Sequence, residues 1–280
     1  MNIRHKVRSA DASIKYILET DDGHMFECVY MPHEEENGVV MCLSCQIGCV
    51  NKCTHCATGK VDFVRDLTDE EICDEVGLML ADNGNPDCLL AVLFMGMGEP
   101  FLNYENVLSA IDRMEARYGI EDEHVTISTV GIVPRIREFA DLGRRIRLAV
   151  SAHATLDSER SQIIPLNKIF SLSSILSAVD YYNSRNTRPV LLQYTLIGGV
   201  NDSDEAAARL CELAKRYRCE VRLIPFNPSP SIMFREPEPE RVEYFLRMFR
   251  ENGVMHVLSR SRGVDVSGGC GQLYLCGAEA

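Results

Sequence analysis

The alternation of apolar and polar positions near the start of the chain predicts a β-hairpin. Residues 14–18 alternate, residues 21–23 (Asp-Asp-Gly) have the composition of a turn, and residues 26–30 form the returning strand. We expect residues 1–38 to form a short N-terminal hairpin extension, followed by one larger domain of residues 39–280.

Beyond the hairpin, short apolar runs alternate with segments of helical periodicity. Strands are predicted at residues 39–43, 90–94, 125–128, 146–151, 190–196 and 221–225, with a last strand at 254–258. Helices are predicted at residues 67–81, 104–117, 134–142, 172–185, 204–218 and 239–252, the first capped by Thr68. Apolar strands joined by helices predict an α/β fold with a parallel sheet.

The hydrophobic pattern leaves the closure of that sheet open. A partial barrel and an open doubly wound sheet fit the periodicity equally well. In both architectures the reactive groups follow the carboxyl ends of the strands. Residues that bind ligands or catalyse are therefore expected directly after the predicted strands.

Three cysteines follow the first strand of the series, Cys49, Cys53 and Cys56, in the spacing C-x3-C-x2-C. Cysteine thiolates hold iron–sulfur clusters. A [4Fe–4S] cube with three protein ligands leaves one iron open to chelate the amino and carboxylate groups of S-adenosylmethionine (SAM). A structural zinc site is the alternative, but zinc prefers four ligands and would have to recruit His55 or Cys45.

Composition narrows the class of protein. The chain has 280 residues, 46% of them hydrophobic, and 12 cysteines, and it begins with no secretory signal pattern. We therefore expect a cytoplasmic protein whose cysteines serve metal or redox chemistry. Its longest apolar run is far shorter than a membrane span, so no membrane partner is expected.

The net charge of −12 bears on the substrate. Proteins that hold nucleic acid tightly usually present a basic face, so an acidic total lowers the expectation of a nucleic-acid partner.

Further motifs identify a resemblance. The chain resembles the RlmN/Cfr family of radical SAM adenosine methyltransferases from Ser9 to Cys276. The matching stretches are residues 42–49, 66–72, 95–100, 128–134, 151–154, 224–228 and 270–273. The resemblance implies a partial (β/α)6 TIM-like barrel, a [4Fe–4S] cluster and SAM as cofactors, and an electron donor such as flavodoxin or ferredoxin. The SAM contacts that it implies are Gly98, Glu99, Ser128, Ser151, Ala152, His153 and Asn227.

The resemblance also implies a chemical route. Cys270 accepts a methyl group from one SAM, and the radical made from a second SAM abstracts a hydrogen atom from that methyl. The resulting carbon radical adds to an adenine carbon of RNA, with carbon 2 expected rather than carbon 8. Cys42 then frees the methylated base by forming a disulfide with Cys270, and Glu27 aligns with a proposed proton acceptor.

The chain departs from the family pattern in three places. It begins near the point where the family's N-terminal helical domain ends, which leaves RNA binding to a separate partner or favours a smaller substrate, such as a nucleotide, a tRNA, a peptide or a metabolite. Cys45 replaces a serine, and we expect it to be inert. His55 replaces an aromatic ring beside the last cluster cysteine, where it can still stack.

Two other functions stay open on sequence alone. A radical SAM enzyme with a non-RNA substrate needs the three cluster cysteines but no methyl-carrying Cys270. A metal-binding or electron-carrying module needs no SAM. Glu99, Ser128 and Asn227 would then have no common ligand to bind.

Overall fold

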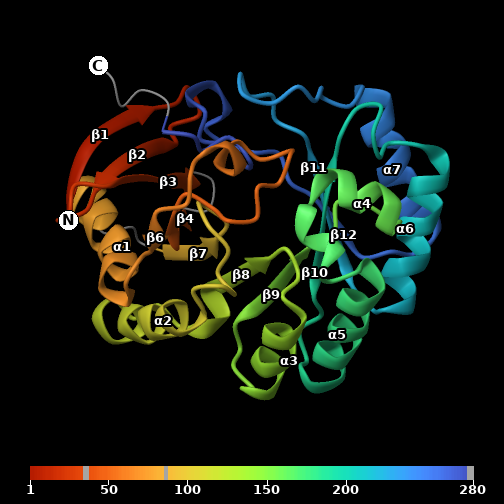
Figure 1. Cartoon of the computed structure of the whole chain (residues 1–280), viewed down its shortest axis with the longest axis horizontal. Coiled ribbons are helices and arrows are strands. Elements are labelled where there is room, and N and C mark those ends of the chain that lie inside the picture. Colours follow the sequence, from red (N-terminus) through yellow and green to blue (C-terminus); the bar gives the residue numbers. More distant parts are fainter. Residues whose placement is uncertain (34–37, 85–87, 276–280) are drawn as a thin grey trace. The chain divides into compact units, whose positions relative to one another are not determined.

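The computed structural model describes residues 1–33, 38–84 and 88–275 (Figure 1). Cys276, at which the family resemblance ends, lies outside the described residues. The chain forms two compact units. The first unit comprises Met1–Lys52, Cys56–Ser128 and Ser261–Ala280, and the second comprises Cys53–His55 and Thr129–Arg260.

A mixed sheet forms the centre of the first unit. Its strand order is β1-β2-β3-β4-β7-β8, with antiparallel pairing from β1 to β4 and parallel pairing from β4 to β8. The strands are β1 (Asn2–Arg8), β2 (Ile14–Glu19), β3 (Met25–His33), β4 (Gly38–Leu43), β7 (Cys88–Phe94) and β8 (Val125–Thr129).

The predicted hairpin is confirmed as β2 and β3, but β1 was missed. Four of the seven residues of β1 carry basic or imidazole side chains, and five of the seven are exposed. A charged strand at the edge of a sheet buries little surface and discourages pairing with another chain, so it lacks the apolar alternation that marks a strand in sequence.

Two helices of the first unit join its parallel strands, α1 (Asp69–Asn83) and α2 (Tyr104–Tyr118). Thr68 caps α1 as predicted: its side chain accepts a hydrogen bond from the backbone N–H of Glu71, whose carboxylate accepts one from the backbone N–H of Thr68. This reciprocal arrangement satisfies two backbone donors and fixes where the helix begins.

The second unit contains a parallel sheet in the order β9-β10-β11-β12. Its strands are β9 (Arg147–Ser151), β10 (Leu191–Leu196), β11 (Glu220–Pro225) and β12 (His256–Leu258). Its helices are α3 (Val133–Asp141), α4 (Asp157–Ile163), α5 (Leu172–Arg185), α6 (Asp204–Arg216) and α7 (Pro239–Glu251). Every residue of β10 is buried, as expected for a parallel strand covered on both faces.

The predicted α/β class, with parallel strands alternating with helices after antiparallel N-terminal strands, is confirmed. Short elements were missed, notably α4 and the two-residue strands β5 (Gln46–Ile47) and β6 (Arg65–Asp66). Among the described helices, none is long and apolar enough to span a membrane.

Candidate functional site

The loop that carries Cys49 and Cys56 is closed by a short antiparallel ladder in the first unit. Gln46 of β5 pairs with Asp66 of β6, and the Val64 N–H donates to the Ile47 carbonyl at 2.9 Å. We call residues 48–64 the cysteine loop. Its start needs glycine: Gly48 has φ +76°, and a Cβ there would lie 2.1 Å from the carbonyl oxygen of Asp62.

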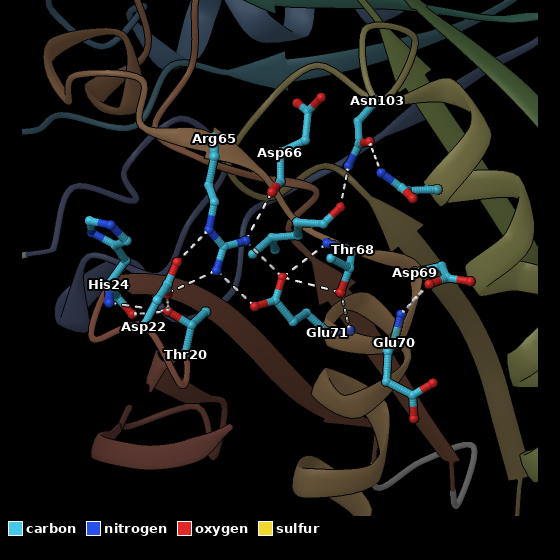
Figure 2. Close-up of polar contacts among 12 residues, drawn as sticks. Thr20, Asp22, His24, Arg65, Asp66, Thr68, Asp69, Glu70, Glu71 and Asn103 are labelled. Atoms are coloured by element: carbon cyan, nitrogen blue, oxygen red, sulfur yellow. Dashed lines mark hydrogen bonds and ion pairs between the residues drawn. The ribbon is translucent and has the colours of Figure 1, made fainter.

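Arg65 ties this ladder to two other segments (Figure 2). Its guanidinium contacts the carboxylate of Asp22 in the β2–β3 turn and that of Glu71 in the first turn of α1, each through two nitrogens at 2.8–2.9 Å. Both pairs have the forked geometry that makes arginine–carboxylate contacts strong and directional. The ends of the cysteine loop are therefore fixed from two sides.

Two thiols of this loop, Cys49 and Cys56, lie in the first unit and are largely removed from water. Burial raises the pKa of Cys49 to about 12 and also raises the pKa of Cys56, so neither forms a thiolate readily without a nearby cation. Bound iron supplies that positive charge. The described residues contain no group of three or more His, Cys, Asp or Glu side chains spaced to hold a single metal ion. The donor set of thiols alone fits an iron–sulfur cluster by its chemistry.

Cys53 and its neighbours belong to the second unit, where they pack on the end of α4. The backbone N–H of Thr54 donates to the Ile163 carbonyl, and the Thr54 hydroxyl donates to the Gln162 carbonyl, both at 2.9 Å. Cys53 is buried. The His55 ring meets the ring of His153 edge-on, with ring centroids 4.6 Å apart, rather than in a stacked arrangement.

Gly98 and Glu99 follow β7 in the first unit. Gly98 has φ +102°, and a Cβ there would come within 2.6 Å of the Gln46 side chain, so only glycine fits. The Glu99 N–H donates to Gln46 Oε1 at 2.9 Å, and Glu99 Oε1 accepts from the Phe101 N–H at 3.0 Å. Gln46 in turn donates to Asp66 at 2.7 Å, which orients its amide. Glu99 is thus held by the same ladder that closes the cysteine loop.

The remaining predicted SAM contacts follow parallel strands. Ser128 lies at the end of β8 in the first unit. In the second unit, Ser151 ends β9 and donates to Gln193 of β10 at 3.1 Å. The Ala152 N–H donates to the Gln193 carbonyl at 3.0 Å, and Asn227 follows β11. Each unit therefore gathers its own share of these residues at the carboxyl ends of its strands.

His153 has a left-handed backbone conformation, and its imidazole ring is held by a hydrogen bond. Its φ is 54°, a left-handed conformation that is uncommon outside glycine. Its Nδ1 accepts a hydrogen bond from the Thr195 N–H at 3.0 Å, so that nitrogen carries no proton. Burial, followed by the nearby His55 and Arg160, holds the pKa of His153 well below its ordinary value. The imidazole is therefore neutral.

Glu27 is fully buried on β3 and has partners at both carboxylate oxygens. Oε1 lies 3.0 Å from the ammonium nitrogen of Lys15 on β2, and Oε2 accepts from the Tyr274 N–H at 2.7 Å. Lys15 is 1% exposed. The hydrogen bond to Tyr274 fastens the C-terminal segment, which carries Cys270, to the hairpin.

The segment of residues 263–275 runs along the sheet of the first unit. A Cβ built at Gly268 would lie 3.7 Å from Lys15 Cβ and 3.7 Å from Val29 Cγ2. Val29 pairs with Cys42 across β3 and β4. Cys270, two residues beyond Gly268, is exposed and Cys42 is half-buried.

The same segment bonds to the cysteine loop. The Ala57 N–H donates to the Gly271 carbonyl at 2.7 Å, and the Thr58 hydroxyl donates to the Leu273 carbonyl at 2.9 Å. Both donors lie just after Cys56. The first unit thus brings together the segments of Glu27, Cys42, Cys56 and Cys270, which are widely separated in sequence.

Sequence reasoning missed three residues that support this site. Lys15 was read only as one position of an alternating strand, although its position beside Glu27 becomes visible once the hairpin register is drawn. Gln46 stood inside a matching motif without a role. No motif or periodicity in the sequence marks Arg160 on α4 as a buried residue. Cys45 is buried, and burial keeps its pKa well above the ordinary value, in accord with an inert thiol.

Known proteins match the chain over most of its length. The Radical SAM superfamily matches residues 43–211. The dual-specificity RNA methyltransferase RlmN of Anaeromyxobacter sp. (strain Fw109-5) is 38% identical, over 95% of this chain and 72% of its own length. The RlmN of Helicobacter hepaticus (strain ATCC 51449 / 3B1) is 39% identical, over 95% of this chain and 76% of its own.

A solved structure agrees with these matches. A radical SAM methyltransferase from Sphaerobacter thermophilus superposes with a TM-score of 0.90 at 36% identity, covering 96% of this chain and 80% of its own. The TIM-like radical SAM fold class predicted from the sequence is therefore confirmed.

Proposed function

Because the chain belongs to the radical SAM superfamily and, within it, to the RlmN family, we propose that it methylates an adenine carbon of RNA, carbon 2, through a methyl-cysteine intermediate. Its cofactors are a [4Fe–4S] cluster and SAM. When bound, they supply the methyl group and a 5′-deoxyadenosyl radical, while the protein supplies placement.

Cys49, Cys53 and Cys56 are the proposed cluster ligands. Their spacing within residues 49–56 and the lack of a fourth cysteine in that run support three protein ligands.

Gly98, Glu99, Ser128, Ser151, Ala152, His153 and Asn227 are the proposed SAM contacts. Their position after parallel strands supports this role, since ligands of α/β folds bind at carboxyl strand ends. The neutral, fixed ring of His153 suits it to pack against a ligand rather than to transfer protons.

Cys270 is the proposed methyl carrier and Cys42 the residue that releases the product. The bond from the Cys270 sulfur to the bridging methylene carbon breaks as the two sulfurs form a disulfide, and the methylene carbon takes up a proton to become the methyl group on the base. The disulfide requires Cα atoms about 4.4–6.8 Å apart. The observation that carries this proposal is the course of residues 263–275. That segment lies against Val29, the cross-strand partner of Cys42, and bonds to the loop that holds Cys56. Glu27 lies under the same segment, which supports a role for it at these cysteines.

A non-RNA substrate is the second candidate, and the net charge of −12 favours it. Part of the affinity of a protein for RNA comes from basic side chains that displace counterions from the phosphates. A chain with a net charge of −12 has more acidic than basic side chains, which weakens this contribution. Under the leading proposal a separate partner can supply the missing basic surface, and a flavodoxin or ferredoxin supplies electrons.

The test is anaerobic reconstitution with SAM and total RNA, followed by mass spectrometry of nucleosides. We expect 2-methyladenosine from the wild-type chain. Cys270→Ala should keep the cluster and SAM cleavage but form no product, and Cys42→Ala should accumulate a covalent RNA adduct. Cys88→Ala removes an exposed cysteine at the start of β7 and should behave as wild type.

Two outcomes would contradict the proposal. Full methylation by Cys270→Ala would remove the methyl-cysteine step. An intact cluster that cleaves SAM without any methylated adenosine, even with partner proteins from an extract, would favour the non-RNA substrate.

A further inference from the structure

Arg160, on the short helix α4 of the second unit, is a buried cation. Its side chain is 0% exposed, and it is among the largest fully buried side chains in the described residues. A buried charge is normally neutralised by an opposite charge, because removing an unpaired ion from water is strongly unfavourable. The surroundings of Arg160 are therefore expected to supply a compensating negative charge.

The hydrogen bonds of Arg160 all go to neutral oxygens. Nε donates to the Ala152 carbonyl at 3.1 Å and Nη1 to Asn167 Oδ1 at 2.9 Å. Nη2 donates to the Ser151 carbonyl at 2.9 Å and also to the Val130 carbonyl. Within residues 1–33, 38–84 and 88–275, no carboxylate forms an ion pair with it.

An acidic side chain on the same helix, Asp157, has hydrogen-bond partners of its own. Asp157 begins α4, but its Oδ1 accepts from the Leu172 N–H at 2.6 Å and from Asn167 Nδ2 at 3.0 Å. Burial lowers the pKa of Arg160 to about 10, so the guanidinium remains charged at neutral pH. Its charge is hydrogen-bonded but not neutralised.

Cys53 is the proposed cluster ligand that the second unit places beside the helix of Arg160. As a thiolate bound to iron it would carry the negative charge that the described surroundings of Arg160 lack. The two residues are linked structurally, since Thr54, next to Cys53, bonds to the carbonyls of Gln162 and Ile163 in the last turn of α4.

We propose that Arg160 is the built-in counter-charge of the iron–sulfur cluster and raises its reduction potential. The inference rests on the proposed role of Cys53 as a cluster ligand. Three thiolates outnumber the positive charge of an oxidised cubane core, and reduction adds one more negative charge. A fixed cation behind one thiolate stabilises the reduced form more than the oxidised form, since net charge and local electrostatics set cluster potentials. Arg160 is a positioning residue, because it acts through Cys53 and touches no substrate.

A purely structural role must be separated from this one. Arg160 also joins the carbonyls of Val130, Ser151 and Ala152, so its loss loosens the strand ends of the second unit. Arg160→Lys keeps the charge but cannot keep all four bonds. Asn167→Leu removes one bond of Arg160 and leaves the charge, so it serves as the matched structural control.

The experiment measures the cluster's midpoint potential by redox titration followed by electron paramagnetic resonance, on anaerobically reconstituted protein without substrate. We expect Arg160→Gln to shift the potential to more negative values. Arg160→Lys and Asn167→Leu should stay close to wild type, even where their thermal stability falls.

An unchanged potential in Arg160→Gln, with iron content and spectrum intact, would overturn the inference. So would equal shifts in Arg160→Gln, Arg160→Lys and Asn167→Leu, which would indicate loosening of the strand ends. A wild-type protein that forms no [4Fe–4S] cluster, or a Cys53→Ala variant that keeps the same cluster, would instead refute the proposed ligand set.

Arg160→Met covers the case in which the glutamine variant does not hold iron. It fills the buried site without a charge, so its cluster potential should be more negative than that of wild type and of Arg160→Lys. A wild-type potential in Arg160→Met would contradict the counter-charge role.

Discussion

Lys15 and Glu27 form an ion pair that is almost fully removed from water. Such pairs add little to stability compared with a packed apolar pair, but removing one partner leaves an uncompensated charge. The pair lies beneath the segment of Cys270, since Glu27 also holds the Tyr274 N–H. Its integrity therefore affects both folding and the placement of the proposed methyl carrier.

We predict that Lys15→Met lowers the free energy of unfolding by roughly 3–5 kcal/mol, the usual cost of breaking a buried pair. Adding Glu27→Leu should recover much of that loss, because no charge is then left buried. Urea denaturation of the single and double variants measures both values. Lys6→Met, which breaks a half-exposed pair with Asp82, should cost less than about 1 kcal/mol. A double variant as unstable as the sum of its singles would contradict this account.

Glu75, on α1, is a buried carboxyl group with no ion-pair partner in the part of the chain that the structure describes. Its Oε2 accepts from the Ser44 N–H at 3.0 Å, and burial raises its pKa well above the ordinary carboxyl value of 4.5. Above that value the folded protein retains a proton that the unfolded chain releases. Stability is therefore lost as the pH rises from about 4.5 towards the raised pKa.

We predict that Glu75→Gln stabilises the protein at pH 8 by roughly 1–3 kcal/mol, since an amide avoids the cost of a buried ionised group. The gain should shrink at pH 5, where Glu75 already binds its proton. Urea denaturation at both pH values is the measurement, and Glu115→Gln, on the exposed side of α2, is the control. Destabilisation that is larger at pH 8 than at pH 5 would show that the sign is wrong.

At the scale of elements, the β5–β6 ladder matters more than its length suggests. It closes the cysteine loop, orients Gln46 towards Glu99, and meets the β2–β3 turn and α1 through Arg65 (Figure 2). Arg113 makes a comparable pair of contacts with Asp69 and Glu70 in the first turn of α1, but it does not contact the ladder.

We predict that Arg65→Met releases the cysteine loop while Arg113→Met does not. Limited proteolysis within residues 48–64 should become severalfold faster in Arg65→Met, and less iron should remain after gel filtration. Similar rates in the two variants would mean that the bridge of Arg65 contributes only general surface stability.

The elements also show what a sequence can reveal. Strands such as β10 were predicted because their burial on both faces requires an unbroken apolar run, and α1 because Thr68 and Glu71 form a local cap. The sequence pattern did not predict the β5–β6 ladder or α4, because each is short and is stabilised by contacts between residues distant in sequence. The spacing of Cys49, Cys53 and Cys56 is a local pattern and could be recognised in the sequence. The proximity of the segments of Cys42 and Cys270 depends on strand pairing and could not. The burial of Arg160 could not be predicted, since nothing in the sequence distinguishes a buried arginine from an exposed one.

At the largest scale, the N-terminal hairpin and the C-terminal segment form one structure within the first unit. Ser9 and the Ala10 N–H bond to the Asp265 carboxylate, and Asp11 Oδ2 accepts from the Gly263 N–H at 2.8 Å. Burial alone would raise the pKa of Asp11, but hydrogen bonds from Gly263 and Ser13 lower it to about 2. The carboxylate form is therefore the one that holds the segment in place.

We predict that acid detaches the C-terminal segment. The contribution of Asp11 is complete above its ordinary carboxyl pKa of 3.8 and is lost as the pH falls towards 2. Protection of residues 263–275 in pulsed hydrogen exchange should fall over this range in the wild type. Asp11→Asn should show weaker protection already at pH 5 and a smaller further change, and full protection in that variant would contradict the linkage.

The hydrogen bonds from the Ala57 N–H and the Thr58 hydroxyl to residues 271 and 273 couple the cysteine loop to the segment of Cys270. Any movement of residues 270–273 must therefore break these bonds or carry residues 57 and 58 with it. Loss of the proposed cluster ligand environment at Cys56 would then also disturb the position of Cys270, the proposed methyl carrier.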